Sequence, residues 1–87
     1  MFHDFEINRA RLVNLSAFAT YKGYELIEVD FVLYKISGTE VYLKGSNFTN
    51  FQSPPYCGNS VDFCMKFMRM TFVDAVKELL VFDKENK

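Results

Sequence analysis

Two cysteines and one histidine are the residues with which this chain could bind a metal ion or attack a substrate. Cys57 and Cys64 lie seven positions apart, and His3 stands near the start of the chain. Structural zinc usually takes four Cys or His ligands in closely spaced pairs, which these three residues do not supply. We therefore expect no metal and two free thiols, with Cys64 packed as a small core residue.

The rest of the inventory also argues against catalysis. No Ser or Cys stands near a plausible general base in the sequence. The four glycines are scattered rather than gathered in a phosphate-binding loop, and the carboxylates occupy positions typical of helix caps and exposed surfaces. We expect no catalytic residue, no cofactor and no enzymatic activity.

Tyrosines and lysines between residues 34 and 44 suggest a different chemistry. Single-stranded nucleic acid is held by the stacking of bases on aromatic rings beside basic groups. Tyr34, Tyr42 and Lys44, with Lys35 at the edge, are the candidates for such a surface. Ordinary cross-strand pairing of the tyrosines beside a solvated lysine explains the same residues. The net charge of −1, from ten basic and eleven acidic residues, favours this second interpretation.

A β hairpin is expected to position these side chains. Residues 29–34 alternate along the chain, Ser37-Gly38 marks a turn, and residues 40–44 return. Residues 48–51 have a Phe at each end of a polar pair, which suggests a short third strand that Pro54-Pro55 ends. The sequence thus predicts a small antiparallel sheet of two or three strands.

The length of the hairpin loop decides which side chains share a face. A two-residue loop would pair Leu33 with Tyr42, whereas a three-residue loop would pair Leu33 with Leu43 and Tyr34 with Tyr42. We prefer the three-residue loop, 37–39, because it keeps the aliphatic residues on one face. This register directs Tyr34, Tyr42 and Lys44 outward, and it directs inward Val29, Phe31, Leu33, Val41 and Leu43.

Helical periodicity marks the N-terminal segment, residues 5–22. Asn14 is a suitable internal N-cap and would split this segment into two short helices. Gly23 stands where a helix-ending glycine belongs. The residues expected on the buried face are Leu12, Leu15, Phe18 and Ala19.

Two further helices are expected to close the chain. Asn59 with Asp62, and Thr71 with Asp74, have the three-residue spacing of a capping box. After each cap, apolar residues recur with helical spacing. These residues are Phe63, Phe67 and Met70 in the first helix, and Phe72, Val76, Leu79 and Leu80 in the second.

Length and composition predict one α+β domain. Hydrophobic residues make up 49% of the chain and aromatic residues 17%, a composition that argues against disorder. We expect a single domain over residues 1–82 and a charged, frayed tail over residues 83–87. No segment is long and apolar enough to span a membrane, so a cytoplasmic location is expected. The surplus of aromatic residues is compatible with a homo-oligomer or a permanent partner.

The C-terminal third of the chain resembles a known family. Residues 57–63 read CGNSVDF, and residues 70–80 read MTFVDAVKELL. This is similar to the pattern Gly-Gly-Asn/Asp-x-Ile-Asp-Phe … Met-Ser-Phe-x-Glu-Ala-Val-x-x-Leu-Leu of the N-terminal zinc-binding domain of bacterial DnaG-type primases. The N-terminal helix before Gly23-Tyr24 is similar to the opening helix of that family. The positions that carry the match have structural roles: Gly58, Asn59, Asp62, Phe63, Thr71, Phe72, Asp74, Ala75 and Leu79.

The chain departs from that family at the metal ligands. Primases hold zinc with a Cys-x-x-His pair and a Cys-x-x-Cys pair, but residues 37–56 contain no Cys or His. The chain therefore resembles the zinc-less versions that precede Toprim-like domains in plasmid and conjugative-transposon proteins. The Toprim catalytic domain is missing from this sequence, so any primase activity would require another chain.

The resemblance implies a non-catalytic accessory module of a mobile element that contacts single-stranded DNA during replication or transfer. The alternative is a module for protein–protein interaction or self-association that binds no nucleic acid. Such a module would dock onto a replication or transfer protein, or onto itself. The aromatic surplus and the missing metal ligands favour this alternative.

Overall fold

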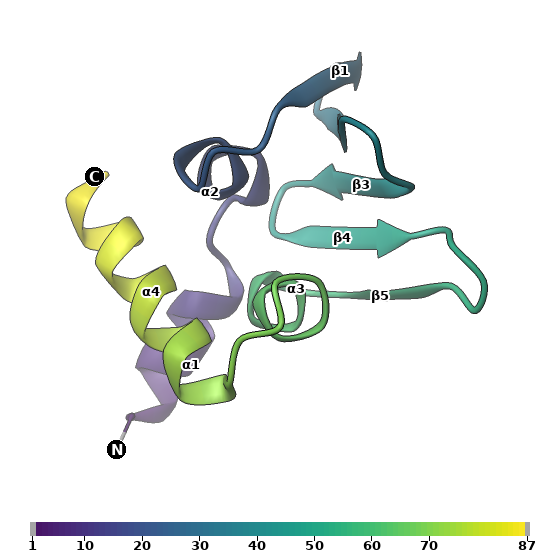
Figure 1. Ribbon diagram of the computed structural model, residues 1–87. Coiled ribbons are helices and arrows are strands. Elements are labelled where there is room, and N and C mark those ends of the chain that lie inside the picture. Colours follow the sequence, from purple (N-terminus) through teal and green to yellow (C-terminus); the bar gives the residue numbers. More distant parts are fainter. Residues whose placement is uncertain (1, 87) are drawn as a thin grey trace.

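Two short helices open the chain in the computed structural model, which describes residues 2–86 (Figure 1). They are α1 (Asp4–Arg11) and α2 (Leu15–Tyr21). The Asn14 side chain caps α2 by accepting a hydrogen bond from the Ala17 N–H at 3.0 Å. The predicted division of the N-terminal segment at Asn14 is therefore confirmed.

The buried face of this segment differs from the prediction at one position. Leu15, Phe18 and Ala19 are fully buried, as predicted, but Leu12 is 74% exposed. Leu12 is the C-cap of α1, so it lies where the helical period no longer applies. Gly23 follows α2 with a φ of +94°, the left-handed conformation that glycine adopts at low cost.

The middle of the chain forms an antiparallel sheet whose strands follow one another in chain order. They are β1 (Leu26–Asp30), β2 (Leu33–Ile36), β3 (Val41–Lys44), β4 (Asn47–Asn50) and β5 (Tyr56–Gly58). Within the described residues the sheet has five strands, more than the two or three predicted. β4 confirms the predicted third strand, whereas the edge strands β1 and β5 were missed as separate strands.

A turn at Phe31-Val32 interrupts the predicted hairpin strand. The Asp30 carboxylate accepts a hydrogen bond from the adjacent Phe31 N–H at 2.7 Å, where the turn begins. The residues on either side form β1 and β2, with Asp30 opposite Leu33. The prediction that Val29 and Phe31 point inward is wrong, since they are 49% and 87% exposed.

The loop between β2 and β3 is longer than predicted. It comprises residues 37–40, so the preferred three-residue loop is wrong. The Thr39 hydroxyl stabilises the longer loop, because it donates to the Ile36 carbonyl at 2.8 Å and accepts from the Val41 N–H at 3.1 Å. Gly38, with a φ of +80°, supplies the left-handed turn.

The longer loop shifts the register of β2 against β3. Tyr34 lies opposite Leu43, and Lys35 lies opposite Tyr42. Successive side chains of a strand point to opposite faces, so a shift of one residue moves β2 side chains to the other face. Tyr34 therefore packs against the core and Leu33 points away from it, which corrects the prediction for both residues.

A reciprocal cap begins α3 (Ser60–Lys66). The Asn59 side chain accepts a hydrogen bond from the Asp62 N–H at 3.1 Å, and the Asp62 carboxylate accepts one from the Asn59 N–H at 3.0 Å. The predicted capping box is therefore confirmed at this helix.

The last helix, α4 (Phe72–Glu85), ends later than predicted. Its N-cap is Thr71, whose hydroxyl accepts a hydrogen bond from the Asp74 N–H at 3.2 Å. The helix continues through Glu85, so the frayed tail predicted over residues 83–87 is wrong for this part of the segment. Lys87 lies outside the described residues.

Gly58 lies where β5 and α3 approach each other closely. A Cβ atom at this position would lie 2.5 Å from the Asp62 Cβ, well inside van der Waals contact. We predict that Gly58→Ala lowers the free energy of unfolding by about 1–3 kcal/mol, because the overlap must push the Asn59–Asp62 capping box apart. Urea unfolding measures this loss, and an unchanged stability would contradict the close packing.

The helices of the described chain gather on one side of the sheet (Figure 1). α2 packs against β1 and β3, and α3 packs against β4 and β5, while α1 lies along α4 behind them. The core fills the space between these layers and includes Phe18, Phe48, Phe63 and Leu79. Among residues 2–86, no helix is long and apolar enough to cross a membrane.

Candidate nucleic-acid interface

The sheet face turned away from the helices carries the candidate binding residues, and we call it the outer face. Val41, Leu43 and Phe48 are buried against the helices. On β3 and β4, the side chains that alternate with these buried residues point to the outer face. On β2, the side chains that lie opposite an outward-pointing residue of β3 point to the outer face as well. The outer face thus carries Leu33, Lys35, Tyr42, Lys44, Thr49 and Phe51.

Four residues are predicted from the sequence to bind nucleic acid, and three of them lie together on the outer face: Lys35, Tyr42 and Lys44. Lys35 and Tyr42 lie directly opposite each other on β2 and β3, and Lys44 follows Tyr42 on the same face of β3. Tyr34 is separated from them, because the register shift places it opposite Leu43 and against the core. The candidate surface therefore contains both nominated lysines but only one of the nominated tyrosines.

Phe51 supplies a second ring on the outer face. Its ring packs edge-on against Tyr42, with 5.4 Å between the ring centroids. Phe51 is also 61% exposed, so part of the ring is available to a ligand. Phe51 was not among the residues predicted from the sequence to form this surface. The available signal was the spacing of Phe51 from Phe48, which places the two phenylalanines on opposite faces of one strand.

Hydrogen bonds hold the backbone on both sides of Phe51. The Phe51 N–H donates to the Glu40 carbonyl at 3.0 Å. The buried Asn50 donates from Nδ2 to the Tyr56 hydroxyl at 3.0 Å and accepts from the Gln52 N–H at 3.0 Å. Because the backbone is already fixed, a ligand that contacts this ring pays little extra conformational entropy.

The charges on the outer face are unevenly distributed. Lys35 and Lys44 lie next to Tyr42, and neither forms an ion pair within residues 2–86. Glu40 is exposed, and its backbone carbonyl accepts a hydrogen bond from the Phe51 N–H, so this acidic residue lies at the Phe51 end of the sheet. The two lysines therefore lie on one side of Tyr42, and Glu40, two residues before Tyr42, lies on the other side next to Phe51.

A shallow hollow of about 440 Å³ lies on this face. Its lining includes Leu33, Tyr42, Lys44 and Phe51. A volume of this size falls within the range of small-molecule sites, so it has room for a planar base. The hollow thus has aromatic walls on which a base can stack, and the Lys44 ammonium group lies at the margin of the hollow.

The cysteines lie apart from each other and differ in exposure. Cys57 is exposed on β5 opposite Thr49, whereas Cys64 is fully buried in α3, as predicted for a core residue. Burial raises the pKa of the Cys64 thiol from 9.0 to about 12, and the Glu78 carboxylate adds to the rise. Within residues 2–86, no three His, Cys, Asp or Glu side chains gather as metal ligands.

The raised pKa of Cys64 predicts a loss of stability in alkali. The unfolded thiol ionises above its pKa of 9.0, whereas the folded thiol stays neutral up to about 12. Stability is therefore fully present below pH 9 and falls as the pH rises through this window, by about 1.4 kcal/mol per pH unit. Urea unfolding of the parent and of Cys64→Ala, followed with rising pH, measures the difference. Parallel pH curves for the two proteins would contradict the prediction.

The residues that carry the primase resemblance lie away from the outer face. Asn59, Asp62 and Thr71 cap helices, while Phe63 and Leu79 are fully buried. In this structure these residues therefore cap helices or fill the core, the roles predicted for them from the sequence. Comparison of the chain with protein-family models, with curated proteins and with solved structures finds no match.

Proposed function

We propose that this protein is a non-catalytic module that binds single-stranded DNA on the outer face of its sheet. The observation that supports the proposal is the grouping of Tyr42 and Phe51 with Lys35 and Lys44 on a sheet face that no described helix covers. Bases stack on the two rings, and the two ammonium groups neutralise phosphates. The acidic net charge limits binding to this one surface.

The preference for single strands follows from the geometry of stacking. A base within a duplex is already stacked on its neighbours and offers its face to no side chain, whereas an unpaired base is free to lie on a ring. Two lysines on the face predict a weak salt dependence. The slope of log affinity against log salt should be roughly −1.4, at about −0.7 for each neutralised phosphate of a single strand.

The resemblance to primase zinc-binding domains adds a setting to this proposal. In that setting the module holds a template strand for a primase catalytic domain, during replication or transfer of a mobile element. The lost metal ligands do not weaken the proposal, because the residues that we assign to DNA binding lie on the sheet.

Fluorescence anisotropy with labelled single-stranded DNA tests the proposal. We expect an anisotropy rise that saturates at low salt, weakens at moderate salt and is much smaller with a duplex of the same sequence. Failure to bind at high micromolar protein and low salt would reject the proposal. A module for protein interaction would then be the remaining explanation of the exposed rings.

The carboxylate of Glu40 provides a second test of the same face. Glu40 is exposed at the Phe51 end of the sheet, where its negative charge repels the phosphates of a bound strand. We predict that Glu40→Gln strengthens the binding of single-stranded DNA about twofold to fivefold, in the range measured for exposed charge pairs. The same anisotropy titration measures the change, and weaker binding by Glu40→Gln would contradict this placement of the strand.

A further inference from the structure

The edge of the sheet at β1 has backbone groups that no described residue pairs with. β1 is the first strand of the sheet and has a partner, β2, on one side only. The Ser37 N–H donates to the Glu25 carbonyl at 2.8 Å, so Glu25 and Ser37 form a hydrogen-bonded pair at the start of the β1–β2 ladder. Because hydrogen-bonded pairs alternate in an antiparallel ladder, the N–H and C=O groups of Leu26 and Glu28 point away from the sheet.

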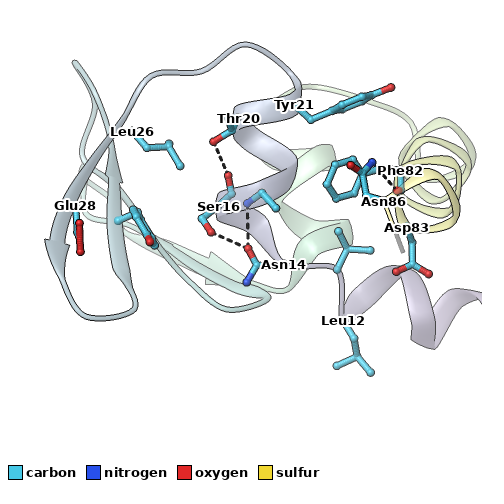
Figure 2. A pocket seen from close by; sticks show the side chains of 13 residues that line it. Leu12, Asn14, Ser16, Thr20, Tyr21, Leu26, Glu28, Phe82, Asp83 and Asn86 are labelled. Carbon is cyan, nitrogen blue, oxygen red and sulfur yellow. Dashed lines mark hydrogen bonds between the residues drawn. The ribbon is translucent and has the colours of Figure 1, made fainter.

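This edge borders a large hollow on the helical side of the sheet. The hollow has a volume of about 940 Å³. Figure 2 shows α2 between the sheet and the end of α4, so α2 forms the floor of the hollow. Leu26, Glu28 and Tyr34 line it on the sheet side, and Phe82 and Asp83 line it on the α4 side.

The hollow and the edge are acidic. Glu28 and Asp83 line the hollow, and no Lys or Arg of the described chain does. Asp83 forms an ion pair with Arg9, with 3.8 Å between Asp83 Oδ2 and Arg9 Nε, whereas Glu28 forms no ion pair within residues 2–86. Glu25 and Asp30 add two further acids at the two ends of β1. A cationic ligand is therefore favoured along this edge.

The other face of β1 carries apolar side chains beside one acid. Ile27 lies opposite Lys35 on the outer face and is 47% exposed, and Asp30 lies opposite Leu33 on the same face. Val29 is 49% exposed at the irregularity in register between Glu28 and Asp30. Side chains of an added strand alternate between the two faces of the sheet, so they would meet an acidic hollow on one face and aliphatic groups on the other.

We propose that β1 accepts an extended segment of a partner protein as an additional strand, with basic side chains over the hollow and apolar side chains beside Ile27 and Val29. The main-chain bonds to Leu26 and Glu28 provide affinity, and the alternating side chains provide specificity. A second copy of this chain is disfavoured as the occupant, because antiparallel pairing of β1 with itself about its centre places Glu28 opposite Glu28.

This partner site differs from the DNA site. The DNA site uses rings and lysines in the middle of the outer face, whereas the partner site uses the free backbone of β1 and the hollow over α2. A partner strand and a DNA strand can therefore be bound at the same time, and each site fails or succeeds in its own assay.

A short fluorescent peptide in which lysine and valine alternate is the probe. We expect it to bind, and we expect the amide signals of Leu26 and Glu28 in the NMR spectrum to shift and to become protected from exchange. Methylating the backbone nitrogens of one alternating set of peptide residues should abolish binding, while methylating the other set should not, because only one edge of the peptide faces β1.

Charge variants complete the test. Glu28→Gln should weaken binding of the lysine peptide about twofold to fivefold and leave DNA binding unchanged. Glu40→Gln, which removes an acid outside the hollow, should leave peptide binding unchanged. Equal binding of a glutamate–valine peptide, equal effects of the two methylated peptides, or shifts confined to other strands would overturn the proposal. Dimerisation of the chain through β1, detected by sedimentation, would also overturn it.

Discussion

Tyr42→Ala and Phe51→Ala are each expected to weaken the binding of single-stranded DNA by about tenfold or more. Stacking of a base on an aromatic side chain contributes roughly 1–3 kcal/mol, and about 1.4 kcal/mol corresponds to a tenfold change in affinity. The two rings lie 5.4 Å apart between centroids, so removing either one also exposes the other. Anisotropy titration of each variant against the parent measures the loss.

Phe5→Ala is the matched control for Phe51→Ala. Phe5 is 64% exposed and Phe51 is 61% exposed, but Phe5 lies in α1 on the helical side of the molecule. We expect Phe5→Ala to bind DNA as the parent does. If it loses as much affinity as Phe51→Ala, the effect reflects exposed aromatic surface in general, and the assignment to the outer face is wrong.

Phe63→Ala is expected to lower the free energy of unfolding by about 3–5 kcal/mol, the usual cost of removing a buried phenylalanine ring. Phe63 is fully buried, with its ring centroid 5.5 Å from that of Phe48 and 5.1 Å from that of Phe67. It thus joins the sheet to α3. Small domains have a total stability of only about 5–15 kcal/mol, so a large share of the variant should be unfolded under mild denaturation.

Phe31→Ala is the corresponding control for stability. Phe31 is 87% exposed in the turn between β1 and β2, so its loss should change the free energy of unfolding by no more than about 0.5 kcal/mol. Urea unfolding of the two variants measures both values. Similar losses for Phe31→Ala and Phe63→Ala would contradict the division between the core and the exposed turn.

The helices were more predictable from the sequence than the sheet. Asn14 and Asn59 are local N-cap signals, and both caps form where they were expected. A cap depends on residues within one helical turn, so its prediction needs no knowledge of distant contacts. The prediction that Leu12 is buried was wrong because Leu12 lies at the end of α1, outside the helical period. The spacing of apolar residues does not show where the helix ends.

The sheet depends on features that the alternation of residues does not contain. The Asp30 carboxylate bonds to the Phe31 N–H and ends β1, although the apolar alternation continues past it. The Thr39 hydroxyl stabilises a loop one residue longer than expected. One extra residue in the loop moves the β2 side chains to the other face of the sheet. Tyr34 therefore does not belong to the candidate site.

The placement of the candidate residues was therefore predicted in part. Tyr42 and Lys44 share the outer face as predicted, whereas Lys35, predicted only at the edge, lies on that face directly opposite Tyr42. For Phe51, the spacing from Phe48 indicated only that the two rings lie on opposite faces. Its contact with Tyr42 depends on the pairing of β4 with β3 and on the bond from its N–H to Glu40, which the sequence does not show.

The measurement that tests the central proposal most directly is an NMR titration of the isotopically labelled protein with a short oligothymidine. If the outer face binds single-stranded DNA, the backbone signals of Lys35, Tyr42, Lys44 and Phe51 shift progressively, while those of α1 and α4 stay in place. Shifts spread over α1 and α4, or an unchanged spectrum at millimolar DNA and low salt, would contradict the proposal.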